Sequence, residues 1–537
     1  MSSSYQVVPR KRGLSLRLAA VMAVVFAMLV APTAQAANAT NINIKVPNAY
    51  SIAGTIRDNV GAVLPNASIF AYSTIGSGSA QTDSTGKYKI LGLVAGSYTV
   101  QVLAPSTKNL VDGYYTTANA SHFTVAAASA TKVAVSPTVP NKTGIDIKLP
   151  SGYTITGTIT STGGTPIPNV SVSAFGVSND STTTNATGKY TVRGLAAGAY
   201  KLAVSPSGNT SYLTGFYSTA NANRFVIAPA SASNIAVGPN KTANIKIPVG
   251  FTISGTITNT TGVALVGVSV RAYTASYSRE VATDAAGKYQ VKGLAAGNYK
   301  LSLGPDSSSV YMDGFFTSAN ANRFTSSAAG ATVLTVGPHK TGVNIKIATG
   351  HTISGTITNT AGTPLADAYI TASSGNNYRD ASTDAAGKYI IRGLATGSQI
   401  LSVSPPYGMN LQSGYYTTAN TNRFTPAAGS ATGIAVGPSK TGINIKLPNG
   451  YTIAGKITGP TGAPLDFAFI YATSTNSSGY AFTETDGTYL MIGLSAGSFK
   501  VQTYPSLETL QAGYYTTANS SHFTPNPASA TNVVIGP

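Results

Sequence analysis

Polar and apolar residues alternate with a period of two along most of this chain. Between residues 154 and 160, Ile155, Gly157 and Ile159 alternate with threonines, as expected of a strand that buries one face. Turns rich in Gly, Pro and Asn separate such segments, and we identify no helix of useful length. The pattern predicts an all-β chain of short strands.

This pattern recurs about every 100 residues. The motif Tyr/Phe/His-Thr/Ser-Ile-x-Gly-x-Ile carries its glycine at Gly54, Gly157, Gly255, Gly355 and Gly455, and a second strand, similar to Asn-Ile-Lys-Ile, precedes each copy. Seven or eight short strands per copy favour a tandem array of five Greek-key β-sandwich domains. Taking the Asn-Ile-Lys-Ile strand as the first of each unit, we expect domains at 37–139, 140–240, 241–339, 340–439 and 440–537.

Residues 1–36 have the features of a signal peptide. The basic residues Arg10, Lys11 and Arg12 precede an apolar run over 18–31, and residues 34–36 read Ala-Gln-Ala, which fits a cleavage site. The apolar run is shorter than the ~20 residues that a membrane-spanning helix needs. We predict cleavage after Ala36, and no membrane span in the rest of the chain.

Composition bounds the compartment and the partners. The chain has no cysteine, which excludes disulfides and thiolate metal sites and suits an exported bacterial protein. The formal net charge is +18, of which four positive charges lie in residues 1–36, so +14 remains, without basic runs. Such a surface favours polysaccharides or other anionic polymers of a cell envelope over nucleic acid, although colloidal solubility explains the charge equally well. We expect an extracellular protein, associated with the cell wall or released; its oligomeric state stays open.

The motif Thr-Asp-x-x-Gly-Lys-Tyr has the residues of a tight turn. Asp can accept hydrogen bonds from free backbone donors, and Gly accepts positive φ. A catalytic carboxylate is the alternative, but Asn185 and Glu484 replace the Asp in two copies and no second acid recurs. Neither the four histidines nor the acidic residues cluster as metal ligands would. We therefore predict no cofactor, no metal and no enzymatic activity.

An aromatic block, of the form Gly-Tyr-Tyr-Thr-Thr-Ala-Asn, recurs at 112–123, 214–225, 313–324, 413–424 and 512–523. In an extended strand its two rings face opposite sides, so one can meet solvent and stack on a sugar. The alternative is a long connection pinned by its own aromatic residues. The candidate ligand contacts are Tyr115, Asn119, Tyr217, Asn221, Arg224, Phe316, Asn320, Arg323, Tyr416, Asn420, Arg423, Tyr515 and Asn519.

The stretch from Thr283 to Leu303, Thr-Asp-Ala-Ala-Gly-Lys-Tyr followed by Gly-Leu-Ala-Ala-Gly and a strand, resembles the carboxypeptidase regulatory-like domain family. The resemblance extends over all five repeats. It implies a prealbumin-like sandwich, related in shape to starch-binding domains, and non-catalytic modules of bacterial surface and secreted proteins. Chains of this kind sometimes carry carbohydrate-binding or amylase-type names.

Two functions are compatible with these observations. The first is a structural or adhesive array, which needs nothing beyond the repeats. The second is a multivalent carbohydrate binder, in which weak sites on successive repeats gain avidity by being linked; the family resemblance implies a role accessory to an amylase-type polysaccharide hydrolase. Exposure of the aromatic blocks would discriminate the two.

Overall fold

The computed structural model describes residues 37–375 and 377–536. The predicted signal peptide lies outside the described residues. Within them, strands and five three-residue 3-10 turns account for the regular structure, and no helix is long and apolar enough to cross a membrane. The prediction of an all-β chain of repeated sandwiches is confirmed.

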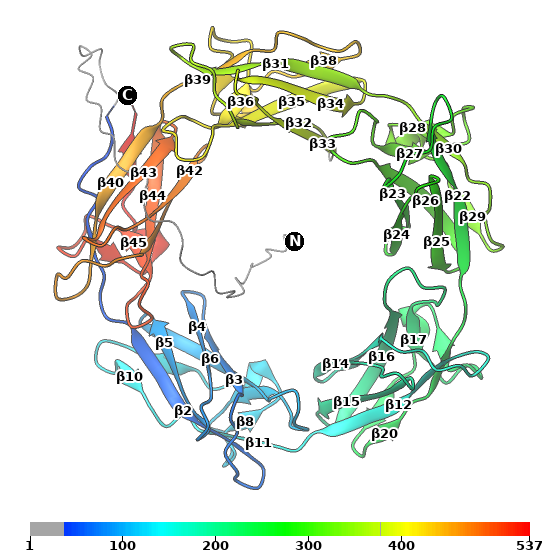
Figure 1. Cartoon of the computed structure of the whole chain (residues 1–537). Helices are drawn as coiled ribbons and strands as arrows, with labels where there is room; N and C mark the ends of the chain where they lie inside the picture. The colour runs from blue at the N-terminus through cyan, green and yellow to red at the C-terminus, as the bar shows by residue number, and fades with distance from the viewer. Residues whose placement is uncertain (1–36, 376, 537) are drawn as a thin grey trace. The chain divides into compact units, whose positions relative to one another are not determined.

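The first repeat shows the plan of all five. Its strands are β2 (Tyr50–Asp58), β3 (Ser68–Tyr72), β4 (Ser77–Gln81), β5 (Lys87–Leu93), β6 (Gly96–Leu103), β7 (Gly113–Tyr115), β8 (Phe123–Thr124), β9 (Val133–Val135), β10 (Asn141–Lys142) and β11 (Ile147–Leu149), with the 3-10 turn η1 (Ala127–Ser129). One sheet has the order β4-β3-β6-β7-β8, with β9 also paired to β6, and the other joins β5, β10 and β11 to β2. Figure 1 labels strands of both sheets.

The other repeats follow the same plan. Repeat 2 contains β12 (Tyr153–Ser161), β13 (Val170–Gly176), β14 (Asn179–Thr183), β15 (Lys189–Leu195), β16 (Gly198–Pro206), β17 (Gly215–Tyr217), β18 (Phe225–Val226), η2 (Pro229–Ser231), β19 (Ile235–Val237), β20 (Lys241–Thr242) and β21 (Ile245–Ile247). Repeat 3 contains β22 (Phe251–Asn259), β23 (Ser269–Tyr273), β24 (Ser278–Ala282), β25 (Lys288–Leu294), β26 (Gly297–Gly304), β27 (Gly314–Phe316), β28 (Phe324–Thr325), η3 (Ala328–Gly330), β29 (Leu334–Val336) and β30 (Ile345–Ile347).

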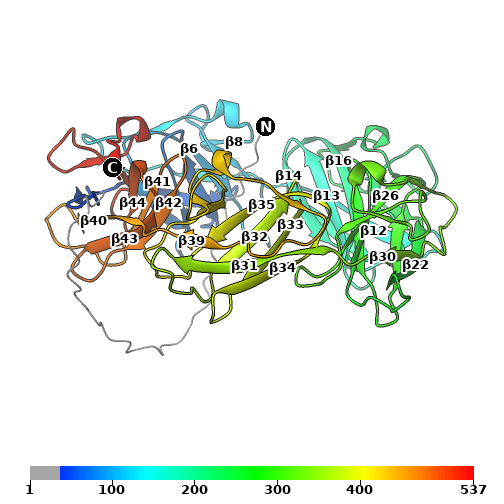
Figure 2. The ribbon, with the colours of Figure 1, turned by 90° about the horizontal axis from the view of Figure 1, so that it is seen from above.

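Repeats 4 and 5 complete the set. Repeat 4, seen in Figure 2, contains β31 (His351–Asn359), β32 (Tyr369–Ser374), β33 (Asn377–Ser382), β34 (Lys388–Leu394), β35 (Gly397–Ser404), β36 (Gly414–Tyr416), β37 (Phe424–Thr425), η4 (Ala428–Ser430), β38 (Ile434–Val436) and β39 (Ile445–Leu447). Repeat 5 contains β40 (Tyr451–Thr458), β41 (Phe469–Thr473), β42 (Ser478–Phe482), β43 (Thr488–Leu494), β44 (Gly497–Tyr504), β45 (Gly513–Tyr515), β46 (Phe523–Thr524), η5 (Pro527–Ser529) and β47 (Val533–Ile535).

The Asn-Ile-Lys-Ile strand closes a repeat instead of opening one. In repeat 1, β11 lies parallel to β2, with Ile147 opposite Ile56, and Ile147 and Leu149 belong to the same hydrophobic core as Ile56. The pattern holds for the later copies. The first four sandwiches therefore begin near the glycine motif and take in the next Asn-Ile-Lys-Ile strand, about ten residues beyond the boundaries expected from the sequence. The fifth takes in the first copy of this strand, β1 (Ile44–Lys45). We call this strand the closing strand.

Alternation within the closing strand follows the sequence pattern. Ile147 and Leu149 are buried, whereas Lys148 between them is exposed, because successive side chains of a strand point to opposite faces. The turn predicted for Thr-Asp-x-x-Gly-Lys-Tyr also forms. In repeat 3, Asp284 Oδ1 accepts hydrogen bonds from the backbone N of Ala286 and Lys288, at 2.9 and 2.8 Å, and Gly287 has φ +69°.

Candidate functional site: repeat joints and aromatic surfaces

Each closing strand is held by a glycine and a tyrosine of its own repeat. In repeat 4, the hydroxyl of Tyr389 donates a hydrogen bond to the carbonyl oxygen of Ile443, at 2.7 Å. A Cβ placed on Gly355 would lie 2.0 Å from the same oxygen. The glycine motif therefore admits the backbone of the closing strand, and the buried tyrosine satisfies its carbonyl group. Burial raises the pKa of this tyrosine.

The same arrangement occurs in every repeat. The tyrosine hydroxyl donates to a closing-strand carbonyl in the pairs Tyr88–Ile145, Tyr190–Ala243, Tyr289–Val343 and Tyr489–Ile42. The recurring tyrosine is thus buried in the core and also satisfies a backbone carbonyl group of the closing strand. The spacing of the two motifs in the sequence does not reveal this hydrogen bond, because the partners lie 53 or more residues apart.

The aromatic block forms the loop that covers the closing strand. In repeat 1, Asn119 Nδ2 donates to the carbonyl oxygen of Phe123 at 2.9 Å, and its Oδ1 accepts from the backbone N of the same residue at 3.2 Å. The loop then accepts a hydrogen bond from the closing strand, through Lys148 N and Ser121 O, at 2.9 Å. The side chain of Asn119, although exposed, is thus engaged within its own loop.

The other predicted asparagines have the same role. Each pairs with the Phe four residues later: Asn221 with Phe225, Asn320 with Phe324, Asn420 with Phe424 and Asn519 with Phe523. The arginines lie beside the second ring of the block: Arg224 donates to the hydroxyl of Tyr217 at 3.0 Å, and the guanidinium of Arg323 lies 5.0 Å from the ring centre of Phe316. Arg423 is exposed.

The second ring of each aromatic pair faces the core. Tyr115, Tyr217, Phe316 and Tyr416 are between 1% and 7% exposed, and Tyr515 is half-buried. The half-exposed ring is the first of each pair: Tyr114, Phe216, Phe315, Tyr415 and Tyr514. The ring named from the sequence as a ligand contact is thus the one that faces the core. The candidate ligand contacts named from the sequence therefore lie mainly in the core or within the loop.

Consecutive repeats are joined by backbone pairing. Leu110, in the loop that leads to β7, forms an antiparallel bridge with Ser151 at the start of repeat 2. Asn109 strengthens this joint, because its Nδ2 donates to Gly152 O at 2.6 Å and its Oδ1 accepts from Gly194 N at 2.8 Å. Equivalent bridges connect Tyr212 with Val249, Tyr311 with Thr349 and Leu411 with Asn449.

The side chains that meet at a joint differ from one joint to the next. Between repeats 3 and 4, the buried Arg379 donates to the carbonyl oxygens of Asp306 and Tyr311, and forms an ion pair with Asp313 at 2.9 Å. Between repeats 2 and 3, Arg279 donates to Gly208 O at 2.8 Å. The residue in the Arg379 position of repeat 2 is Asp180, which faces Asp112.

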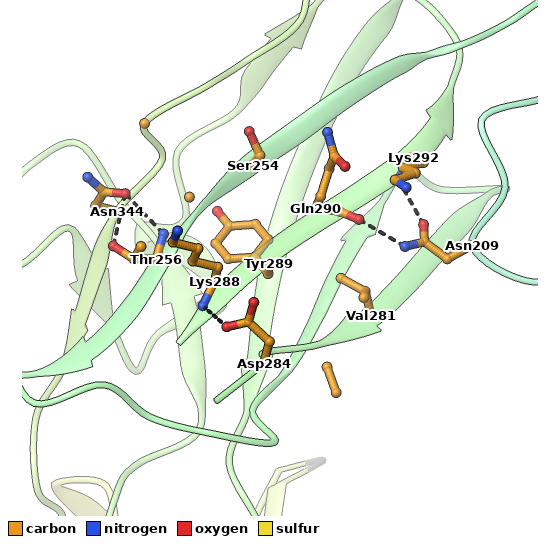
Figure 3. A pocket seen from close by; sticks show the side chains of 13 residues that line it. Asn209, Ser254, Thr256, Val281, Asp284, Lys288, Tyr289, Gln290, Lys292 and Asn344 are labelled. Carbon is orange, nitrogen blue, oxygen red and sulfur yellow. Dashed lines mark hydrogen bonds between the residues drawn. The ribbon is translucent and has the colours of Figure 1, made fainter. Parts of the chain in front are cut away.

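Surface depressions lie over the sheets of several repeats. One, of about 530 Å³, lies over β22 and β25 (Figure 3). Asp284 is the acidic side chain among its lining residues, and it accepts a hydrogen bond from the backbone N of Lys288 (Figure 3). Asn344 Oδ1 accepts hydrogen bonds from the backbone N and the hydroxyl of Thr256. Across the described residues, no group of three or more His, Cys, Asp or Glu side chains could hold a metal ion.

A family model matches four stretches of the chain: the carboxypeptidase regulatory-like domain, at residues 51–138, 154–249, 252–337 and 352–437. These stretches make up more than half of the chain. The chain belongs to this family. A comparison with curated proteins finds no match.

Solved structures that match this chain include a streptococcal ancillary pilin, a minor pilin of Streptococcus agalactiae and the TIE protein of Bacillus anthracis. For the ancillary pilin the identity is 9%, the TM-score is 0.22, and the match covers 56% of this chain and 99% of that chain. For the minor pilin the identity is 17% and the TM-score is 0.22, and the match covers 37% of this chain and 96% of that chain. For the TIE protein the identity is 13% and the TM-score is 0.16, and the match covers 71% of this chain and 68% of that chain.

Repeat 5 of this carboxypeptidase regulatory-like array has a cluster of aromatic side chains on its surface. The outward face of its larger sheet carries an aromatic cluster of Phe469, Tyr471, Tyr480, Phe482 and Tyr504. The ring centres of Phe469 and Phe482 are 5.2 Å apart, and those of Phe469 and Tyr504 are 5.9 Å apart. Beside it, a depression of about 800 Å³ is lined by Tyr480 and Phe482 and by the loop of repeat 4 that contains Tyr407.

Proposed function

We propose that this chain is an exported, non-catalytic structural array that acts outside the cell, on or near the envelope. The observation that carries the proposal is the joint between consecutive repeats. A recurring antiparallel bridge and side chains such as Asn109 connect each repeat to the next. An array that must keep its repeats in a fixed relation needs such contacts, whereas independent binding modules are better served by flexible linkers.

Family membership and composition support this proposal. Carboxypeptidase regulatory-like domains fill most of the chain, and the absence of cysteine together with the leader-like residues 1–36 suits bacterial export. The net positive charge favours contact with anionic envelope polymers. None of these features supplies a nucleophile or an acid–base pair.

Removal of the Asn109 side chain tests the structural role of a joint. Asn109→Ala deletes two hydrogen bonds that link repeat 1 to repeat 2, each worth about 0.5–1.5 kcal/mol. We expect faster amide hydrogen exchange at Gly194, whose N–H loses its acceptor, with the cores of both repeats unchanged. The Gly152 amide, which donates to the backbone oxygen of Asn109, should exchange faster as the joint loosens. Lys108→Ala, an exposed neighbour in the same loop, is the control and should leave exchange unaltered. Equal exchange in all three proteins would contradict a coupled array.

Export and lack of catalysis need separate measurements. Mass spectrometry of the protein from the culture medium and from the cell-wall fraction should show a chain that begins at Ala37. The same protein should release no reducing ends from starch, cellulose, chitin or cell wall. Retention in the cytoplasm, or sugar release that scales with protein concentration, would overturn the proposal.

A second candidate function, carbohydrate binding, is favoured by the aromatic cluster of repeat 5. Exposed aromatic rings can stack on sugar rings, and Tyr480 and Phe482 are 53% and 51% exposed, beside the 94% exposed Tyr407. Unlike the multivalent binder expected from the aromatic blocks, this site would occur once in the described chain, between repeats 4 and 5. Pull-down on insoluble glycans at low and high salt should show salt-resistant binding that is lost in a Tyr407→Ala, Tyr480→Ala, Phe482→Ala variant. Equal binding by the variant would exclude this surface.

A further inference from the structure

The closing strand of repeat 5 comes from the opposite end of the described chain. β1 (Ile44–Lys45) lies parallel to β40, with Ile44 opposite Ile457 and Lys45 opposite Thr458. The internal closing strand β39 pairs with β31 in the same way, with Ile445 opposite Ile357 and Lys446 opposite Thr358. The segment that precedes repeat 1 thus occupies, in the same register, the place that the next repeat's segment fills elsewhere.

This segment is buried as deeply as an internal closing strand. Ile42, Ile44 and Val46 are 8%, 1% and 0% exposed, and they form one hydrophobic core with β40, β43 and β44. The Tyr489 hydroxyl donates to Ile42 O at 2.9 Å, and a Cβ on Gly455 would lie 2.1 Å from that oxygen. The glycine and tyrosine of repeat 5 therefore form a groove that receives residues 41–46.

The contacts that follow this strand reproduce a repeat joint. Asn48 forms an antiparallel bridge with Leu510, and Gln511 Nε2 donates to Asn48 O at 2.7 Å, as Gln412 Nε2 does to Asn449 O at 2.9 Å between repeats 4 and 5. One difference sets this joint apart. In repeats 1 to 4, the closing strand follows the last strand of its own sandwich after a short connection. In repeat 5, the closing strand β1 is connected to its sandwich only through repeats 1 to 4.

We propose that the groove of repeat 5 is a docking site for residues 38–46 of a second copy of this chain, and that copies join head to tail through it. The contact is heterologous: the N-terminal segment on one side, the glycine–tyrosine groove on the other. Such a contact either closes within a molecule or propagates between molecules. Within one copy the segment is present at an effective concentration of about millimolar, so dilute protein is closed and monomeric.

Exchange between copies follows when the closed joint opens at high protein concentration. The segment keeps its register in the second copy because the groove is unchanged, and every closing-strand contact is remade. Each added copy leaves one free segment at one end and one free groove at the other. Assembly therefore proceeds to oligomers of increasing length and not to a fixed dimer.

Complementation between two variants tests this assembly. Gly455→Ala blocks the groove but keeps the segment, and Ile44→Asp spoils the segment but keeps the groove. The chain beginning at Ala37 is opened in moderate urea at high concentration, returned to buffer, and analysed by size-exclusion chromatography with light scattering. We expect a ladder of oligomers from the wild type, monomers from each variant alone, and dimers only from the mixture, since the mixed dimer has one spoiled segment and one blocked groove left.

Controls and a peptide probe make the outcome decisive. Lys45→Ser, an outward-facing change in the same segment, and Gly429→Ala, where no atom lies within 4 Å of the added Cβ, should both keep the oligomer ladder. A synthetic peptide of residues 38–48 should bind Ile44→Asp at least tenfold more tightly than Gly455→Ala. Oligomers from either variant alone, a wild type that stays monomeric at every concentration, or equal peptide binding to both variants would overturn the proposal.

Discussion

The close approach at Gly355 permits a quantitative prediction. In Gly355→Ala, the new Cβ would lie 2.0 Å from Ile443 O and 2.4 Å from Ile443 C, whereas real Cβ atoms essentially never make contacts under 3.0 Å. Both atoms belong to backbone, which cannot rotate away as a side chain would. The closing strand must therefore shift outward or leave the groove.

The two limits of this response bound the cost. If the strand shifts and stays docked, the overpacking costs about 1–3 kcal/mol. If it leaves, Ile445 and Leu447, which are 1% and 0% exposed, lose their burial at about 1.5–3 kcal/mol each, which amounts to about 3–6 kcal/mol. Because the clash is with backbone, we expect the larger value.

Hydrogen exchange measured by mass spectrometry gives this energy for repeat 4 alone. The reporter is the amide of Lys446, which donates to Asn422 O at 2.9 Å in the closing strand. Its protection should fall by the factor that corresponds to about 3 kcal/mol or more. Gly429→Ala in the same repeat, where the added Cβ meets no atom within 4 Å, should stay within about 0.5 kcal/mol of the wild type. A loss below about 1 kcal/mol in Gly355→Ala would refute the assigned role of the glycine.

Two further substitutions probe the same architecture. Tyr389→Phe removes the hydrogen bond to Ile443 O and leaves a buried carbonyl without that donor, so the free energy of unfolding of repeat 4, measured by urea denaturation, should fall by about 1–3 kcal/mol; no change would mean that water replaces the hydroxyl. Burial raises the pKa of Asp112 above 3.8, and the nearby Asp180 raises it further, so the folded state binds the proton more tightly and stability falls as the pH rises from about 3.8 through the raised pKa. Asp112→Asn, which can still accept from Ala104 N, should therefore have the higher melting temperature at pH 7, with the difference vanishing below pH 3.8; a lower melting temperature at pH 7 would contradict this sign.

Much of the fold is visible in the sequence because it depends on local rules. The period-two alternation places Ile147 inward and Lys148 outward, and the Asp and Gly of the turn motif have roles that depend only on residues two to four positions away. The number of repeats and the all-β class follow from the spacing of the motifs. These features need no knowledge of which strands pair.

Local rules do not reveal which strand begins each repeat. A tandem repeat has the same period whichever strand is taken as its first, and β11 pairs with β2 across about 90 residues. Which ring of the aromatic pair faces outward could not be predicted from the sequence for a related reason. Alternation says that two adjacent rings face opposite sides, but only the pairing of β36 with β35 decides that Tyr415 faces outward and Tyr416 faces the core.

The joints explain why some side chains differ between repeats that share the same fold. The closing-strand contacts are the same in every repeat because each strand must enter the same groove, whereas each joint is formed by two different repeats and can vary. Arg379 needs the acceptors of repeat 3, which are Asp306, Tyr311 and Asp313. In repeat 2 the residue in the position of Arg379 is Asp180, which lies near Asp112 of repeat 1. A buried arginine without its partners costs several kcal/mol. Repeats 2 and 4 are therefore not interchangeable, and the order of the repeats is fixed by side chains that the shared motif does not contain.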